Sequence, residues 1–101
     1  MLSATPRIGV KLPKTQDQPQ LPSPMDLETF GRTAEQLGYE SIWTTESWGN
    51  DPFVELTELA DVTENVRVGT AIMNVFTRSP VVIAQGAETL ARRSGERAVL
   101  G

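Results

Sequence analysis

Segments with alternating apolar residues and longer segments with helical periodicity follow one another along this chain. Alternation predicts strands at Arg7–Leu12, Glu40–Thr45, Val66–Ile72 and Ala98–Leu100. In the third of these, Val66, Val68, Thr70 and Ile72 share one face, and Arg67, Gly69 and Ala71 share the other. The pattern therefore predicts four strands with one helical segment between each pair.

Each predicted helix begins at a capping residue followed by proline, at Ser23-Pro24, Asp51-Pro52 and Ser79-Pro80. Gly38, Asn65 and Gly95 are the predicted ends. Apolar residues three or four positions apart define the faces that we expect to be buried. These are Leu27, Phe30, Ala34 and Leu37 in the first helix, Phe53, Leu56, Leu59, Ala60 and Thr63 in the second, and Ile83, Ala87 and Leu90 in the third.

The helix starts are equally spaced, because Pro24, Pro52 and Pro80 lie 28 residues apart. Alternating strands and helices of this length predict an α/β fold with a parallel sheet in one domain, residues 1–101. Residues 13–23 are rich in Gln and Pro and are predicted to form a flexible loop. Two architectures fit this pattern, an open doubly wound sheet and part of a (β/α)8 barrel.

Composition excludes several classes of function. The chain has a net charge of −4, which argues against non-specific nucleic-acid or anionic-membrane binding. It has no cysteine and no histidine, which removes thiol catalysis, Ser-His-Asp triads and most zinc sites. No apolar segment approaches the roughly 20 residues of a membrane span, and no signal peptide is predicted, so we expect a cytoplasmic protein.

Parallel sheets place ligands where their strands end, and three predicted strand ends meet at one edge here. That edge holds Lys11, Asn74 and the segment Thr44–Asn50. Glu46 is a candidate general acid or base, or a group that orients a neighbour; the alternative is a hydrogen-bonded or solvated loop carboxylate. Ser47 is more often a loop hydroxyl than a nucleophile, because no histidine exists to activate it.

Three further positions at this edge have both a functional and a structural interpretation. Arg78 would bind an anion at the third helix start or lie on the surface. Asn74 would hydrogen-bond to a carbonyl or amide edge of a ligand, or form a turn. Gly69 and Ala71 would admit a flat ring near the backbone, or serve tight packing. Trp43 is expected in the core, and Trp48 either stacks on a ligand or packs.

Three blocks of the sequence resemble the N-terminal part of the luciferase-like monooxygenase superfamily: Gly-Tyr-Glu-Ser-Ile-Trp-Thr-Thr-Glu-Ser-Trp-Gly-Asn-Asp-Pro-Phe (Gly38–Phe53), Val66–Pro80 and Ala87–Gly101. Within this superfamily, the sequence resembles a subgroup of oxidoreductases that depend on the deazaflavin coenzyme F420. These enzymes are related to methylene-tetrahydromethanopterin reductase. This resemblance implies a TIM barrel that binds F420 or FMN at the C-terminal strand edge. It also implies hydride transfer or flavin-dependent oxygenation with a small-molecule substrate.

The resemblance assigns roles to individual residues. By this resemblance Glu46 and Ser47 take the catalytic positions. Many members of the family have His where this chain has Ser47, and the Glu-Ser-Trp-Gly block favours F420 as the cofactor. A non-proline cis peptide is implied at Ala71–Ile72, behind the flavin ring. The positions implied to contact the cofactor are Thr45, Gly69, Thr70, Ala71, Ile72 and Asn74.

The length of 101 residues is well below the roughly 250 of a full barrel. We therefore expect an N-terminal half-barrel with three βα units and the start of a fourth strand. Its open sheet edges predict homo-oligomers or other association. Three functional hypotheses follow: an F420- or FMN-dependent oxidoreductase, an inactive truncated paralogue or a subunit that needs a partner half-barrel, and an unrelated small open-sheet binding domain.

Overall fold

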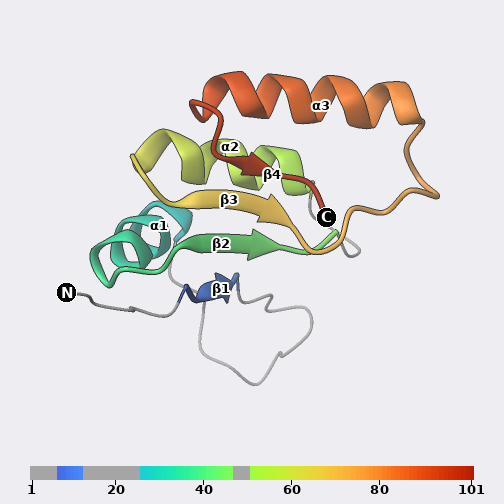
Figure 1. The fold of residues 1–101 in the computed structure, drawn as a ribbon. Coiled ribbons are helices and arrows are strands. Elements are labelled where there is room, and N and C mark those ends of the chain that lie inside the picture. Colours follow the sequence, from blue (N-terminus) through green and yellow to red (C-terminus); the bar gives the residue numbers. More distant parts are fainter. Residues whose placement is uncertain (1–6, 13–25, 47–50) are drawn as a thin grey trace.

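The computed structural model describes residues 7–12, 26–46 and 51–101. Strands and helices alternate along them, as the sequence pattern predicts (Figure 1). The strands are β1 (Gly9–Lys11), β2 (Ser41–Thr44), β3 (Arg67–Thr70) and β4 (Ala98–Val99). The helices are α1 (Leu27–Gln36), α2 (Pro52–Val62) and α3 (Pro80–Arg93).

The four strands form one parallel sheet in the order β1-β2-β3-β4. The helices lie together on one side of this sheet (Figure 1). A doubly wound sheet reverses its strand order and carries helices on both faces, whereas a (β/α)8 barrel does neither. The arrangement is therefore that of successive units of a barrel, and the predicted α/β barrel class is confirmed.

The hydrophobic core lies between the sheet and the helix layer. Four of its side chains have no exposed surface, Ile42 and Val68 from the sheet and Leu56 and Leu59 from α2. Register places Val10, Ile42, Val68 and Ala98 on this same face of neighbouring strands. Burial of such side chains is the main driving force for docking the helices on the sheet.

The opposite face of the sheet carries Trp43, which is half-buried rather than in the core as expected. Its indole N–H donates a hydrogen bond to Ser41 Oγ at 2.7 Å. The ring extends over both neighbouring strands, because a Cβ at Gly9 would lie 2.6 Å from Trp43 Nε1 and one at Gly69 would lie 2.7 Å from Trp43 Cζ3. Glycine is needed at both positions to admit the indole.

The start of α1 differs from the prediction. Ser23 and Pro24 lie outside the described residues, and the helix begins at Leu27 with Asp26 as its N-cap. Asp26 Oδ1 accepts from Thr29 N at 2.8 Å, and Asp26 Oδ2 accepts from Thr29 Oγ1 at 3.0 Å. Asp26 therefore caps the helix with both carboxylate oxygens. The equal spacing of 28 residues therefore does not extend to the first helix.

Gly38 follows the end of α1 at a φ of 87°, as predicted, but Leu37 is the C-cap and is 69% exposed, not buried. Two other boundaries are corrected. The C-cap of α2 is Thr63, not Asn65. Ile72 lies beyond β3 and is 70% exposed.

The other predicted helix boundaries are confirmed. Asp51 caps α2 and Ser79 caps α3, each followed by proline at the first turn. Gly95 follows the end of α3 at a φ of 66°, in the left-handed region that glycine adopts without steric cost. On α3, Leu90 is buried, whereas Ile83 and Ala87 are only half-buried. None of the helices in the described ranges is long and apolar enough to cross a membrane.

Candidate functional site at the strand ends

The C-terminal ends of β2 and β3 are joined by backbone hydrogen bonds that continue past both strands. Ala71 N donates to Thr44 O at 2.8 Å, and Glu46 N donates to Ile72 O at 3.2 Å. The peptide bond between Ala71 and Ile72 is cis, as the resemblance implied. The predicted meeting of the second and third strand ends is therefore confirmed.

Glu46 is directed toward the segment that follows β3. Its Oε1 accepts from Asn74 N at 2.8 Å, and its Oε2 accepts from Arg78 Nε at 2.9 Å. Both side chains of the ion pair are largely covered, with 12% of Glu46 and 16% of Arg78 exposed. Glu46 is thus a hydrogen-bonded loop carboxylate and not a solvated one, and its contacts hold Asn74 and Arg78.

Arg78 joins a second carboxylate and an aromatic ring. Its Nη2 lies 3.2 Å from Asp51 Oδ2, and its guanidinium carbon lies 5.5 Å from the centre of the Phe53 ring. The hydrogen bond to Glu46 is the largest effect on the Arg78 pKa; with Asp51 it outweighs the opposing desolvation and raises the pKa above its ordinary value. Two carboxylates already neutralise this cation, which weakens the anion-binding interpretation.

The segment after β3 presents apolar side chains outward. Met73 is buried, but Ile72, Val75 and Phe76 are exposed, Phe76 to 95%. Asn74 forms a turn here, because its Oδ1 accepts from Phe76 N at 2.9 Å. Sequence reasoning did not single out Val75 and Phe76; the signal was two apolar residues inside a polar loop that joins a strand to a capped helix.

The remaining candidate residues have different surroundings. Thr45 is half-buried at this edge, and Thr70 is buried. The Thr70 hydroxyl accepts from Gly101 N at 3.0 Å and donates to Gly101 O at 3.2 Å. The space beside Gly69 is filled by Trp43, so the packing interpretation of this glycine has a structural basis. Ser47 and Trp48 lie outside the described residues. No observation tests the catalytic or cofactor roles, which stay predictions.

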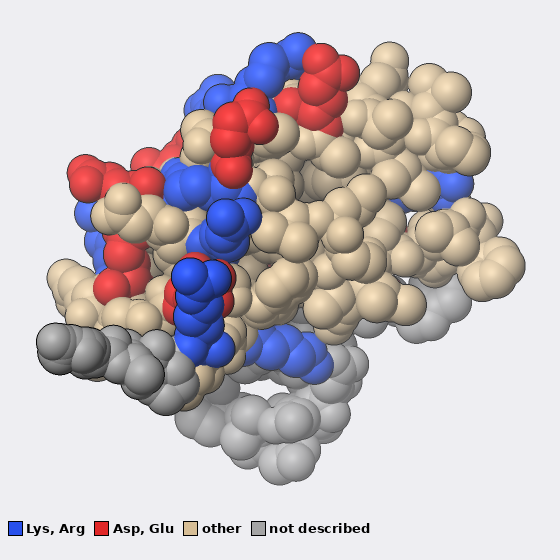
Figure 2. Space-filling view, viewed as in Figure 1, with Lys and Arg blue, Asp and Glu red and all other residues tan. Residues whose placement is uncertain are grey.

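Charge is distributed unevenly over the molecule. Figure 2, viewed as Figure 1, shows the side toward which the strands point covered mostly by uncharged residues. Acidic and basic side chains gather at the opposite side, over α1 and the C-terminal half of α3. The strand-end edge is therefore the less charged side of this view.

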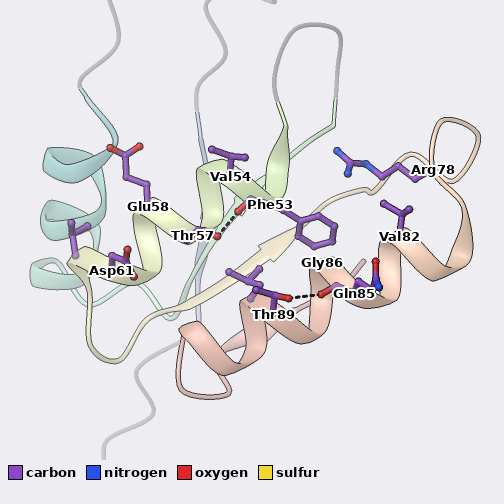
Figure 3. Close-up of a pocket in the computed structure, with 12 residues that line it drawn as sticks. Phe53, Val54, Thr57, Glu58, Asp61, Arg78, Val82, Gln85, Gly86 and Thr89 are labelled. Carbon is purple, nitrogen blue, oxygen red and sulfur yellow. Dashed lines mark hydrogen bonds between the residues drawn. The ribbon is translucent and has the colours of Figure 1, made fainter.

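A groove of about 740 Å³ lies between α2 and α3 on the outer layer (Figure 3). Phe53, Val54, Val82 and Gly86 line it, and Arg78 lies at one end. A Cβ at Gly86 would lie 2.5 Å from the Phe53 ring, so the glycine admits the ring between the two helices. The groove lies between the two helices and reaches the strand-end edge only through Arg78, which contacts Glu46.

Comparison with known proteins places the chain in a family. The pattern of the family described as luciferase-like monooxygenase matches residues 3–101. A protein of Mycobacterium tuberculosis provisionally named a coenzyme F420-dependent oxidoreductase is 31% identical over 100 residues, which cover 99% of this chain and 28% of that protein. The 5,10-methylenetetrahydromethanopterin reductase of Methanolobus tindarius is 36% identical over 73 residues, covering 71% of this chain and 22% of the reductase.

A solved structure agrees with these sequence matches. The coenzyme F420-dependent tetrahydromethanopterin reductase from Methanopyrus kandleri superposes with a TM-score of 0.76 at 25% identity, covering 97% of this chain and 27% of the reductase. The chain thus spans between a fifth and a third of the length of the proteins it matches. The family pattern matches residues 3–101, and the parallel strands and outer helix layer agree with it. The chain therefore belongs to the luciferase-like monooxygenase family.

Proposed function

We propose that this chain, as an oxidoreductase or the N-terminal piece of one, binds coenzyme F420 at its strand-end edge without a partner chain. The reaction would transfer a hydride between F420 and a small organic substrate. The observation that carries this proposal is the likeness to proteins named for F420 dependence, in sequence to the mycobacterial protein and in fold to the Methanopyrus reductase. The names of these relatives favour F420 over FMN.

The residues at the edge suit a flat ring. Ile72, Val75 and Phe76 expose apolar side chains beyond the end of β3, where they can contact a ring and exclude water from it. The ring would lie over this segment and not against Gly69, where Trp43 already fills the space. When bound, the deazaflavin ring supplies the hydride chemistry, and the chain supplies binding and orientation.

A second candidate function follows from length. The chain spans 28% of the mycobacterial relative, and a complete F420 site needs loops from other units of a barrel. We therefore propose as the alternative a chain that is inactive alone or that completes its site with a partner half-barrel. The two proposals differ in whether this chain binds a cofactor without a partner.

Titration of the purified chain with F420 and with FMN, followed by fluorescence, tests the first proposal. We expect saturable quenching of F420 and weaker binding of FMN. Phe76→Ser should weaken F420 binding by about tenfold, because loss of a buried aromatic contact is worth about 1–2 kcal/mol. Leu37→Ser is the matched control, because Leu37 is also exposed but lies at the end of α1. Absence of binding at any concentration would reject the first proposal and favour the second.

A further inference from the structure

We propose that Glu46 is a positioning residue, whose carboxylate fixes the segment Ile72–Arg78 in the conformation that binds a cofactor. The consequence for cofactor binding rests on the proposed function; the consequence for the segment itself does not. In this role Glu46 acts through Asn74 and Arg78, and it is not the group that exchanges a proton with substrate.

The first support is where the carboxylate points. Each oxygen accepts one hydrogen bond from the segment after β3, from Asn74 N at 2.8 Å and from Arg78 Nε at 2.9 Å. A proton-transfer group must direct an oxygen toward the reacting atom. Glu46 instead directs both oxygens into its own chain, with 12% of its side chain exposed.

The second support is that Arg78 is itself held from another element. Asp51, the N-cap of α2, lies 3.2 Å from Arg78 Nη2, and the Phe53 ring lies beneath the guanidinium. The two ion pairs of Arg78, with Glu46 and with Asp51, thus connect the end of β2, the start of α3 and the start of α2. Hydrogen bonds between ionised partners are about twice as strong as neutral ones, so these ion pairs are strong contacts to the segment.

The third support is what the segment carries. Between the two anchored positions, Asn74 and Arg78, lie Val75 and Phe76, and Ile72 lies just before them; all three apolar side chains are exposed. Phe76 N is bonded within the segment, to Asn74 Oδ1. Holding such side chains in place before binding lowers the ordering cost of binding. Without Glu46, that cost would appear as lost affinity.

The test uses three variants of the full chain, Glu46→Gln, Arg78→Met and the double variant. The matched controls are Glu88→Gln and Arg92→Met, which remove the same charges from an exposed ion pair on α3. Amide hydrogen exchange at Asn74 and Phe76 is measured by NMR without cofactor. The amide of Val68, which donates to Arg97 O inside the sheet, is the internal reference. Affinity for F420 is measured in parallel.

We expect each single variant to speed exchange at Asn74 and Phe76 by about tenfold and to leave Val68 unchanged, since coupled contacts are worth about 1–2 kcal/mol. The double variant should exchange no faster than Glu46→Gln, because that single change already weakens both hydrogen bonds of the carboxylate. F420 affinity should fall by a similar factor and with the same non-additivity. The control variants should match the wild type in both measurements.

Exchange that is unchanged in Glu46→Gln, or effects that simply add in the double variant, would overturn the proposal. If a variant fails to fold, Arg78→Lys keeps the charge while losing the fork that spans Glu46 and Asp51, and it should show the same exchange pattern. Failure of the wild type to bind F420 would reject the proposed function alone, and the exchange data would still decide the role of Glu46.

Discussion

At the scale of the single residue, Glu35 has a role that its sequence position does not reveal. Its carboxylate leaves α1 and accepts backbone N–H groups from the turn before β3, from Asn65 at 2.7 Å and Val66 at 2.9 Å. The N–H of Glu64 also donates to both of its oxygens. One carboxylate therefore satisfies three consecutive backbone donors and ties α1 to the turn that precedes β3.

This arrangement makes stability depend on pH. Partial burial acts to raise the Glu35 pKa, but the N–H groups of Asn65, Val66 and Glu64, together with the charge of Arg97, outweigh it and lower the pKa below its ordinary value. The stabilisation is then fully present above the unfolded pKa of about 4.3 and is lost as the pH falls through the lower folded value.

We predict that Glu35→Gln lowers the free energy of unfolding by about 1–3 kcal/mol near neutral pH, because hydrogen bonds to an ionised group are lost. Urea unfolding at about pH 7 and about pH 3 measures this, and the difference from wild type should shrink at the lower pH. Glu28→Gln is the control on the same helix, since the ion pair of Glu28 with Arg32 is exposed. A difference that persists unchanged at low pH would contradict the ionic mechanism.

The sequence could place residues on the correct elements but could not reveal these partners. Glu46 was predicted at the strand-end edge and lies there, yet its contacts with Asn74 and Arg78 depend on how two loops approach each other. The same holds for Glu35, whose partners belong to a turn far along the chain. Contacts of this kind follow from tertiary packing, which periodicity and capping patterns do not encode.

At the scale of the element, Arg97 holds the end of α2. Its Nη2 donates to the carbonyls of Ala60 and Thr63, and its Nη1 donates to Thr63 Oγ1 and Val66 O, at 2.9–3.2 Å. Its Nε donates to Ser94 O at the end of α3. The last carbonyls of a helix lack partners within the helix, and here one guanidinium supplies them from the loop before β4.

We predict that Arg97→Met destabilises the chain by about 3 kcal/mol, because it leaves several covered carbonyls without partners. Arg97→Lys should recover less than half of this loss, since an ammonium cannot reproduce the planar fork. Thermal unfolding followed by circular dichroism measures both. Arg92→Met removes the same charge from an exposed position on α3 and should change stability little. Equal stability of Arg97→Met and Arg92→Met would refute the capping role.

Helix starts were more predictable than helix ends. Asp51-Pro52 and Ser79-Pro80 use local side-chain caps that the sequence displays directly. The end of α2 has no such local cap. Arg97 satisfies its carbonyl groups and Glu35 accepts the N–H groups of the turn that follows, and both residues are distant in sequence. The start of α1 was placed too early, at Ser23-Pro24, whereas Asp26 is the residue that caps the helix.

At the scale of the whole molecule, the sheet has one covered and one open face. The chain measures 45 × 35 × 21 Å, a flat shape suited to one sheet and one helix layer. Within the part that the structure describes, β1 and β4 are the outer strands, each paired on one side only. In a closed barrel, neighbouring strands satisfy both edges and the inner face is filled.

We propose that copies of this chain associate through these outer strands, because unpaired strand edges offer backbone donors and acceptors to another chain. Size-exclusion chromatography with light scattering should give a mass above that of the 11.0 kDa monomer, rising with concentration. The variant Phe76→Ser distinguishes association through the outer strands from association through the exposed segment after β3. If the outer strands pair, its mass in solution should equal that of the wild type. A monomer at every concentration would show that the edges do not pair. Loss of association in Phe76→Ser would instead assign the contact to the apolar side chains that we place at the cofactor edge.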